Sequence, residues 1–274
     1  MARRIIIALL CTLVLLGAAR RLTSGKPRDV HVEDGDVVLS FRTVTEHFGP
    51  GQPYLKVRLE APSGSRIMLH YVTPDDPSVQ KRGLVPIGNK QYSMYLPIRG
   101  IGSRIKYAFS LTRPDGSVVR VPEGEKYYVL KFKGKASGWA IAAHVVFMFG
   151  AFFFMTYALL GAIGILRKSE GKRRAVGAAR WALLFTFIGT WPLGLLLNWQ
   201  TFGVLWEGYP FGRDVTDNKT QIVFVFWLVS LLLVRGSLMG RGEERDRLGP
   251  KGFAWAIVAS FAVSLALYLL PHSL

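Results

Sequence analysis

WAIAAHVVFMFGAFFFMTYALLGAIGIL, residues 139–166, decides the fold class of this chain. The stretch contains no Asp, Glu, Lys or Arg. A run of 18 or more apolar residues is long enough to cross the hydrocarbon core of a bilayer as a helix. Inside that core, only helices and closed barrels satisfy the hydrogen bonds of the backbone. The stretch therefore predicts a transmembrane helix over 139–166.

Three further apolar stretches follow this one along the chain. We predict that they form transmembrane helices over 176–199, 220–239 and 252–270. Small residues recur at every fourth position in two of the predicted helices, a spacing that lets helices approach closely in lipid. They are Ala158 and Ala162, then Ala256, Ser260 and Ser264, and also Ala262 and Ala266. The spacing predicts packing within one four-helix transmembrane bundle, or contact with another membrane subunit.

Basic residues cluster in two of the three connectors between these stretches. The 167–180 connector holds six Lys or Arg residues and the 235–251 connector holds five, whereas 200–219 holds only Arg213 and Lys219. Short loops rich in Lys and Arg stay in the cytoplasm. We therefore predict a multi-pass protein of the cell inner membrane. Its 200–219 loop and its C-terminus would lie on the extracytoplasmic (periplasmic) side.

MARRIIIALLCTLVLLGAARR, residues 1–21, has the anatomy of a secretory signal. A basic start is followed by an apolar stretch over 5–19 that ends in Gly17, Ala18 and Ala19. We predict a signal peptide over 1–19. An uncleaved anchor is the alternative, because Arg20 and Arg21 disfavour cleavage at this point. Both interpretations export the residues that follow, in agreement with the orientation given by the connectors.

Residues 30–133 have a different pattern, in which apolar and polar residues alternate. Val37, Leu39 and Phe41 are one example, and the same period of two recurs in five further stretches up to residue 121. This period predicts half-buried strands. The segments PSGS, TPDDP and RPDGS between them are rich in turn-forming residues. About seven short strands predict an exported antiparallel β-sandwich of immunoglobulin- or fibronectin-like architecture, which precedes the helical bundle.

The formal net charge of +17 raises the question of a nucleic-acid partner. Much of the positive charge lies beside the apolar stretches, which is typical of contact with anionic lipid headgroups. We therefore predict the lipid bilayer as a partner and no binding of nucleic acid. Cys11 is the only cysteine, so an intramolecular disulfide and a cysteine-based zinc site are excluded.

WEGYPFGRDVTDNKT, residues 206–220, concentrates charges and aromatic rings between two predicted spans. One interpretation is a ring-rich loop at the membrane interface that ends in a helix cap. The other is a docking surface for a partner. For this second interpretation we predict an interaction loop that consists of Trp206, Glu207, Tyr209, Phe211, Arg213, Asp214 and Asp217.

Two histidines are candidates for a shared cofactor. His144 would lie near the outer end of the first predicted span, and His272 follows the end of the fourth. A haem b or a copper ion held between them is the redox hypothesis, and two ordinary interfacial histidines are the alternative. His31, His47 and His70 are widely spaced and predict no zinc triad.

Motifs for catalysis and for ion transport are lacking. The sequence contains no G-x-S-x-G and no phosphate-binding GxxxxGK[ST]. Apart from Arg180, which belongs to the basic connector at the start of 176–199, its spans contain no His, Lys, Arg, Asp or Glu residue except His144 and the terminal Arg235. We therefore favour a function that is not enzymatic. We expect an accessory or interaction subunit of an envelope complex, with other membrane or periplasmic proteins as partners. A redox subunit that binds haem b, copper or quinone and a small transporter component are the alternatives.

Overall fold

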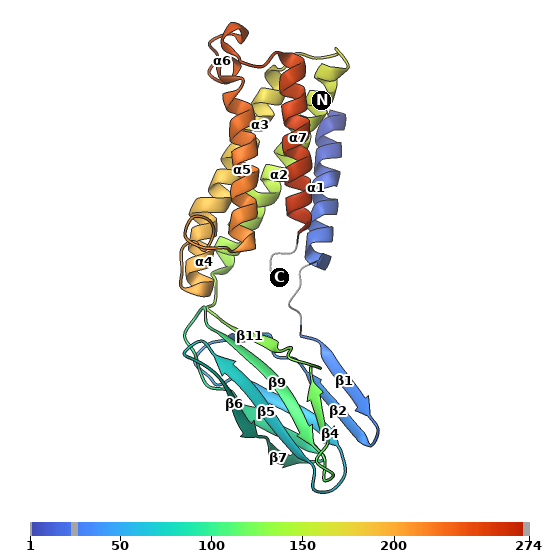
Figure 1. Ribbon diagram of the computed structural model, residues 1–274. Coiled ribbons are helices and arrows are strands. Elements are labelled where there is room, and N and C mark those ends of the chain that lie inside the picture. Colours follow the sequence, from blue (N-terminus) through green and yellow to red (C-terminus); the bar gives the residue numbers. More distant parts are fainter. Residues whose placement is uncertain (1, 23–26, 271–274) are drawn as a thin grey trace. The chain divides into compact units, whose positions relative to one another are not determined.

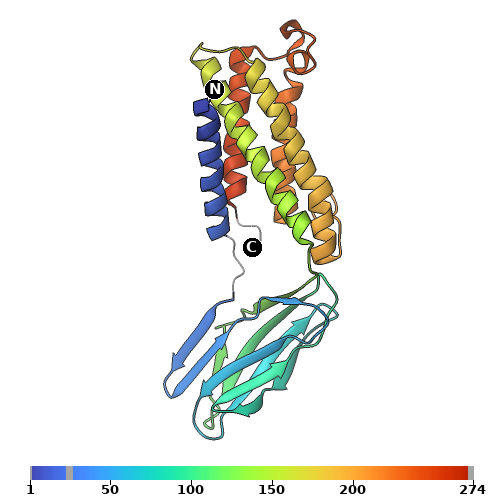
Figure 2. The same ribbon diagram turned by 180° about the vertical axis from the view of Figure 1, so that it is seen from behind.

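The computed structural model describes residues 2–22 and 27–270, which form two compact units. One unit is helical. The other contains the β-strands and consists of Gly25–Lys135 with Gln200–Gly203. Figures 1 and 2 show the elements of each unit from opposite sides.

The helical unit is built from five long helices and several short turns. The elements are α1 (Ala2–Leu22), α2 (Gly138–Leu166), α3 (Arg173–Ile188), a π-helical turn η1 (Gly189–Leu193), α4 (Gly194–Phe202), α5 (Val215–Leu232), α6 (Arg235–Leu238), a 3-10 turn η2 (Glu243–Arg245) and α7 (Pro250–Leu269). Helix α3, the turn η1 and helix α4 follow one another without a break. The π-helical turn contains Pro192, which has no N–H for a regular helical hydrogen bond.

Four helices of the described residues are long and apolar enough to cross a membrane. They are Ala2–Ala19, Gly138–Leu166, Arg173–Phe202 and Pro250–Leu269. The prediction of four such helices after the β-strands is therefore wrong in order, because α1 precedes the strands. The predicted third span falls on α5, whose first residues, 215–221, are mostly polar. Residues 1–19, which include most of α1, are predicted from the sequence to be a signal peptide, and this stays a prediction.

Small residues bring the helices of this unit close together. Ala158 and Ala162 on α2 are fully buried. A Cβ atom on the neighbouring Gly161 would lie 3.1 Å from the Cβ atom of Ala175 on α3. On α7, Ser264 Oγ accepts a hydrogen bond from Trp227 Nε1 at 2.9 Å, and Ser260 Oγ lies 2.9 Å from Ser230 Oγ on α5. The small residues at these positions thus pack within the unit.

The first helix packs against α2 and α7. Ala8, Thr12 and Leu15 on α1 are buried. Arg4 Nη1 lies 2.5 Å from Glu170 Oε2, in the connector between α2 and α3. The start of α1 therefore lies at the same end of the helical unit as this connector (Figures 1 and 2).

The second unit contains two β-sheets. Their strands are β1 (Asp29–Asp34), β2 (Val37–Arg42), β3 (Glu46–Phe48), β4 (Tyr54–Glu60), β5 (Arg66–Thr73), β6 (Asp76–Gly83), β7 (Val85–Gly88), β8 (Gln91–Tyr95), β9 (Arg104–Thr112), β10 (Val118–Val121) and β11 (Tyr128–Lys133). The five-stranded sheet has the order β1-β2-β4-β8-β7. The six-stranded sheet has the order β3-β11-β9-β5-β6, and β10 pairs with β9. The short strand β3 pairs with β11 in parallel, which departs from the predicted antiparallel pattern.

The two sheets share one apolar core. Val57 on β4 and Leu69 on β5 come from different sheets and are both fully buried. Tyr107 on β9 is also fully buried, and its hydroxyl accepts a hydrogen bond from Val44 N at 2.8 Å. Burial raises the pKa of the Tyr107 hydroxyl, so this group stays neutral inside the core. In β2, β4 and β5 the alternating pattern of the sequence thus corresponds to strands that bury one face. The immunoglobulin- or fibronectin-like type stays a prediction.

Candidate functional site

His144 makes a hydrogen bond between two helices. It lies on α2, and its Nδ1 atom is 3.0 Å from the carbonyl oxygen of Gly189, the first residue of the π-helical turn. A carbonyl oxygen only accepts hydrogen bonds, so Nδ1 carries the hydrogen and Nε2 is the acceptor atom of the neutral ring. The bond therefore joins α2 to η1 through one of the two ring nitrogens.

His272 lies outside the described residues, so the structure does not place it relative to His144. The histidines of the β-unit have separate partners: His31 contacts Ser40 and Glu33, His47 contacts Gly51, and His70 contacts Ser110. Within 2–22 and 27–270, no group of three or more His, Cys, Asp or Glu side chains has a geometry that could hold a metal ion.

The segment between α4 and α5, residues 204–214, is termed the aromatic loop. Asp214 ends it as the N-cap of α5, and its Oδ1 atom accepts hydrogen bonds from Thr216 N at 2.8 Å and Asp217 N at 3.1 Å. A carboxylate at this position satisfies free N–H groups and favours the positive end of the helix dipole. The predicted site residue Asp214 therefore stabilises the start of α5.

Asp217 fixes the aromatic loop from inside the helical unit. Its side chain is buried, and its Oδ2 atom accepts a hydrogen bond from the backbone N–H of Glu207 at 2.8 Å. Asn198 on α4 donates to both carboxylate oxygens of Asp217, at 3.1 and 3.2 Å. The next residue, Asn218, accepts from Tyr209 N at 2.6 Å. The first turn of α5 thus holds the backbone of the loop at two points.

The aromatic loop also contacts the helices through a ring. Trp206 stacks on Trp191 of η1 with 6.2 Å between ring centroids, and Trp191 contacts Phe224 of α5 edge-on at 4.7 Å. By contrast, Tyr209 is 70% exposed and Phe211 is 84% exposed. Large rings exposed to this degree are common at interaction surfaces and at membrane interfaces.

The predicted interaction loop therefore divides into two groups of residues. Trp206, Asp214 and Asp217 face the helices, and Glu207 contributes its backbone N–H and C=O groups to the loop. Tyr209, Phe211 and Arg213 are exposed. The sequence pattern identified the whole segment but did not separate these two groups. The division between inward and outward residues depends on the contact of Asp217 with Asn198, a residue of α4 that lies outside the segment.

A buried ion pair lies at the opposite end of the helical unit. Lys172, just before α3, is 2.6 Å from Asp246 Oδ2, and the two side chains are only 1% and 2% exposed. Asp246 also accepts hydrogen bonds from the backbone N–H and the hydroxyl of Ser237. Burial alone would raise the pKa of Asp246, but hydrogen bonds from Lys172 and Ser237 outweigh it and hold the pKa below its ordinary value. The pair therefore fastens α6 and the following connector to α3.

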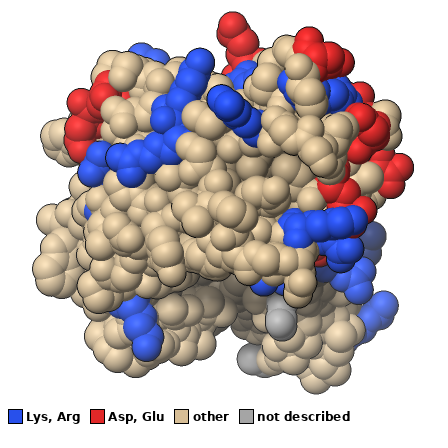
Figure 3. Space-filling model, turned by 90° about the horizontal axis from the view of Figure 1, so that it is seen from below, with Lys and Arg blue, Asp and Glu red and all other residues tan. Residues whose placement is uncertain are grey.

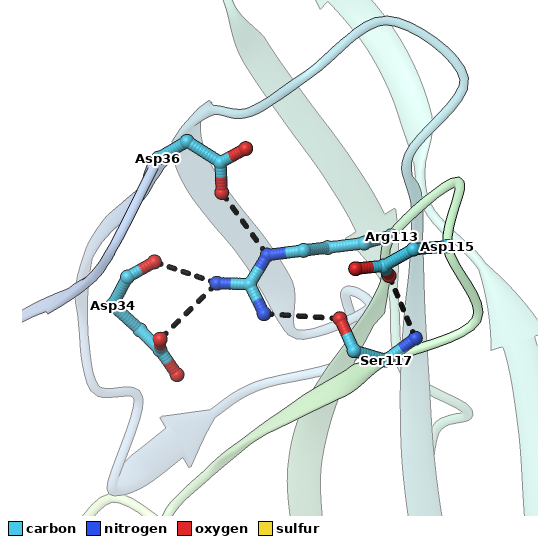
Figure 4. Close-up of polar contacts among 5 residues, drawn as sticks. All are labelled: Asp34, Asp36, Arg113, Asp115 and Ser117. Atoms are coloured by element: carbon cyan, nitrogen blue, oxygen red, sulfur yellow. Dashed lines mark hydrogen bonds and ion pairs between the residues drawn. The ribbon is translucent and has the colours of Figure 1, made fainter.

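A cluster of carboxylates in the β-unit surrounds an arginine (Figure 4). Arg113 donates from Nε to Asp36 Oδ1 at 3.1 Å, and from Nη2 to Asp34 Oδ1 at 3.1 Å. Its Nη1 atom donates to Ser117 Oγ at 3.2 Å. The guanidinium group therefore joins the β1–β2 turn to the β9–β10 turn and thereby links the two sheets. This arrangement supports a structural role for the cluster.

Charges of both signs are visible on the face shown in Figure 3. Lys, Arg, Asp and Glu side chains lie toward its edges, around a broad uncharged area.

No protein-family model and no curated protein sequence matches this chain. A functional proposal therefore depends on the geometry of the sites described above.

Proposed function

We propose that this chain is an interaction subunit of an envelope complex in the inner membrane, and that its aromatic loop contacts a partner protein. The exposure of Tyr209 and Phe211 on a loop held by the buried Asp217 supports this proposal. Aromatic residues dominate the energetic centres of protein interfaces. A ring on a fixed backbone also loses little conformational entropy when it binds. The partner would therefore supply an apolar pocket for these two rings.

The proposal includes an orientation in the membrane, with the aromatic loop and the β-domain outside the cytoplasm. The basic start of α1 and the Lys- and Arg-rich connectors lie at one end of the helical unit, as the ion pair between Arg4 and Glu170 indicates. Basic residues favour the cytoplasmic side. The aromatic loop lies at the other end of this unit. The end of α1 at Leu22 and the start of α2 at Gly138 also lie at that end of the helical unit.

In this orientation α5 is a fifth crossing helix. Its polar first turns are stabilised from within the helical unit, since Asp217 contacts Asn198 and the Lys219 ammonium donates to the Leu270 carbonyl oxygen at 2.8 Å. Its last part is apolar and packs on α7 through Trp227. Polar groups near a membrane surface are tolerated when they have such partners.

Site-specific photo-crosslinking in intact cells tests the proposed contact. A photoreactive phenylalanine analogue replaces Tyr209, Phe211 or, as the control, Trp199 on α4, which is 58% exposed. We expect a discrete protein adduct from positions 209 and 211 and none from position 199. If a folded, membrane-inserted protein gives no protein adduct at 209 or 211, or the same adducts at all three positions, the aromatic loop is not the contact surface.

A further inference from the structure

A cationic groove lies beside the buried ion pair of the helical unit. It has a volume of about 630 Å³ and opens between the first part of α3 and the segment that contains α6. Three arginines line it, Arg173 and Arg180 from α3 and Arg241 from the connector after α6. Together these side chains place three guanidinium groups around one groove.

Among the described residues, three of the four acidic side chains in the neighbouring connectors pair with other residues, and Glu244 is the exception. Glu170 pairs with Arg4 and Arg174, and Glu243 and Asp246 pair with Lys172. Among residues 2–22 and 27–270, no acidic side chain forms an ion pair with the three groove arginines. The positive charge of the groove is therefore not neutralised by a direct ion pair within the described part of the chain.

An apolar groove of about 390 Å³ adjoins the cationic one. Arg180 and Leu238 line both grooves, so the two meet at these residues. The apolar groove continues along α3 past Trp181 and Leu184 to Phe187, with Phe224 on the α5 side. Trp181, Leu184 and Phe187 are each between 43% and 51% exposed. The combined surface is cationic at one end and apolar along its length.

The walls of the cationic groove are fixed in place. The pair Lys172–Asp246 is buried, and Ser237, which also lines the groove, donates two hydrogen bonds to Asp246. Helix α6 is thereby held against α3, so the backbone of both walls is in place before a ligand binds. A site with fixed walls loses less free energy to ordering when it binds.

We propose that these two adjoining grooves bind one anionic phospholipid. The phosphate group would lie among Arg173, Arg180 and Arg241, because guanidinium groups match the geometry and charge of phosphate oxygens. One acyl chain would lie along the apolar groove beside Trp181 and Phe187. Basic pockets between membrane helices are known to bind such headgroups. Charge at one end and apolar surface along the rest match the two parts of this ligand.

Native mass spectrometry of the full chain in detergent tests the proposal. Dioleoyl phosphatidylglycerol is added to the unaltered protein, to a groove variant (R173Q/R180Q/R241Q) and to a matched control (R167Q/R245Q/R247Q). The control removes the same charge from exposed arginines that do not line the groove. We expect the groove variant to bind this lipid about 100-fold more weakly, since each arginine near a phosphate contributes about five-fold in affinity. The control should bind like the unaltered protein.

Two further measurements separate the lipid from a free anion. A phosphatidylglycerol with six-carbon chains has the same headgroup but cannot fill the apolar groove, so we expect weaker binding. Excess inorganic phosphate should not displace the long-chain lipid. R180Q alone, which changes a residue shared by both grooves, serves as the second variant if the triple variant does not fold. The proposal is wrong if groove and control variants bind alike, if phosphatidylcholine binds equally well, or if phosphate displaces the lipid.

Discussion

Side chains beside the aromatic loop hold it in place, and side chains within it extend outward. Asp217 is buried and accepts hydrogen bonds from Glu207 N and from Asn198, whereas Tyr209 and Phe211 are exposed. An unpaired buried polar group costs free energy, so loops of this kind need an inward-facing acceptor. The exposed rings depend on that acceptor for their position.

Replacement of Asp217 by alanine should destabilise the helical unit and the loop. We expect Asp217→Ala to lower the free energy of unfolding by about 2 kcal/mol, because it removes charge-assisted hydrogen bonds to Asn198 and Glu207 N. Thermal unfolding in detergent measures the change. Glu207→Ala is the control, since it keeps the backbone N–H that Asp217 binds. Equal unfolding temperatures for Asp217→Ala and the unaltered protein would contradict this role of Asp217.

His70 on β5 should make the stability of the β-unit depend on pH. Its Nε2 atom lies 2.6 Å from Ser110 Oγ, and burial, with smaller effects from Lys81 and Arg120, lowers the pKa of His70 below its ordinary value of about 6.5. The unfolded chain therefore binds a proton more readily than the folded chain. The contribution of neutral His70 to the free energy of unfolding of the β-unit is fully present above a pH of about 6.5. It is lost as the pH falls toward the pKa of His70 in the folded protein.

Thermal unfolding of the intact protein at several pH values checks this expectation. The difference in unfolding temperature between the unaltered protein and His70→Gln should change as the pH falls below about 6.5. A difference that stays constant across this range would show that His70 does not titrate differently in the two states.

Among the secondary-structure elements, those with one buried face were predictable from the sequence. In β4, Leu55, Val57 and Leu59 are buried and alternate with exposed or partly exposed residues, as the period of two predicts. Strand β6 was not predictable, because its side chains are mostly exposed and it is held by backbone pairing to β5. The aromatic loop was predictable from its composition. The division between inward and outward residues was not, since it depends on contacts with α4 and α5.

The close packing of α5 on α7 depends on Ser264, which is fully buried and accepts a hydrogen bond from Trp227 Nε1. A larger side chain at this position has no space. We expect Ser264→Leu to lower the unfolding temperature by several degrees. Ala262→Leu on the exposed side of α7 is the matched control and should have little effect. If both variants unfold at the same temperature, the close contact is not required.

Helix α1 should remain in the mature protein. Its side chains Ala8, Thr12 and Leu15 are buried and Arg4 pairs with Glu170, so removal of α1 would expose a packed surface. This interpretation corresponds to the uncleaved anchor rather than to the signal peptide. Intact-mass measurement of the purified protein should find a chain that still includes these residues. A mature N-terminus near Arg20 would contradict it.

The two ends of the helical unit present different kinds of surface. The arginine-lined groove and the buried Lys172–Asp246 pair are at one end, and the exposed rings of the aromatic loop are at the other. Four helices are long and apolar enough to cross a membrane, so the two ends would face different compartments. A lipid site and a protein contact would then occupy opposite sides of the same helical unit.

Cysteine labelling in intact cells tests this arrangement most directly. Cys11, the only native cysteine, is replaced by serine, and a single cysteine is introduced at Phe211 or at Lys168. A membrane-impermeant maleimide should label Phe211→Cys in intact cells, and should label Lys168→Cys only after the membrane is permeabilised. Labelling of Lys168→Cys in intact cells with protection of Phe211→Cys would contradict the orientation and the proposed contact surface.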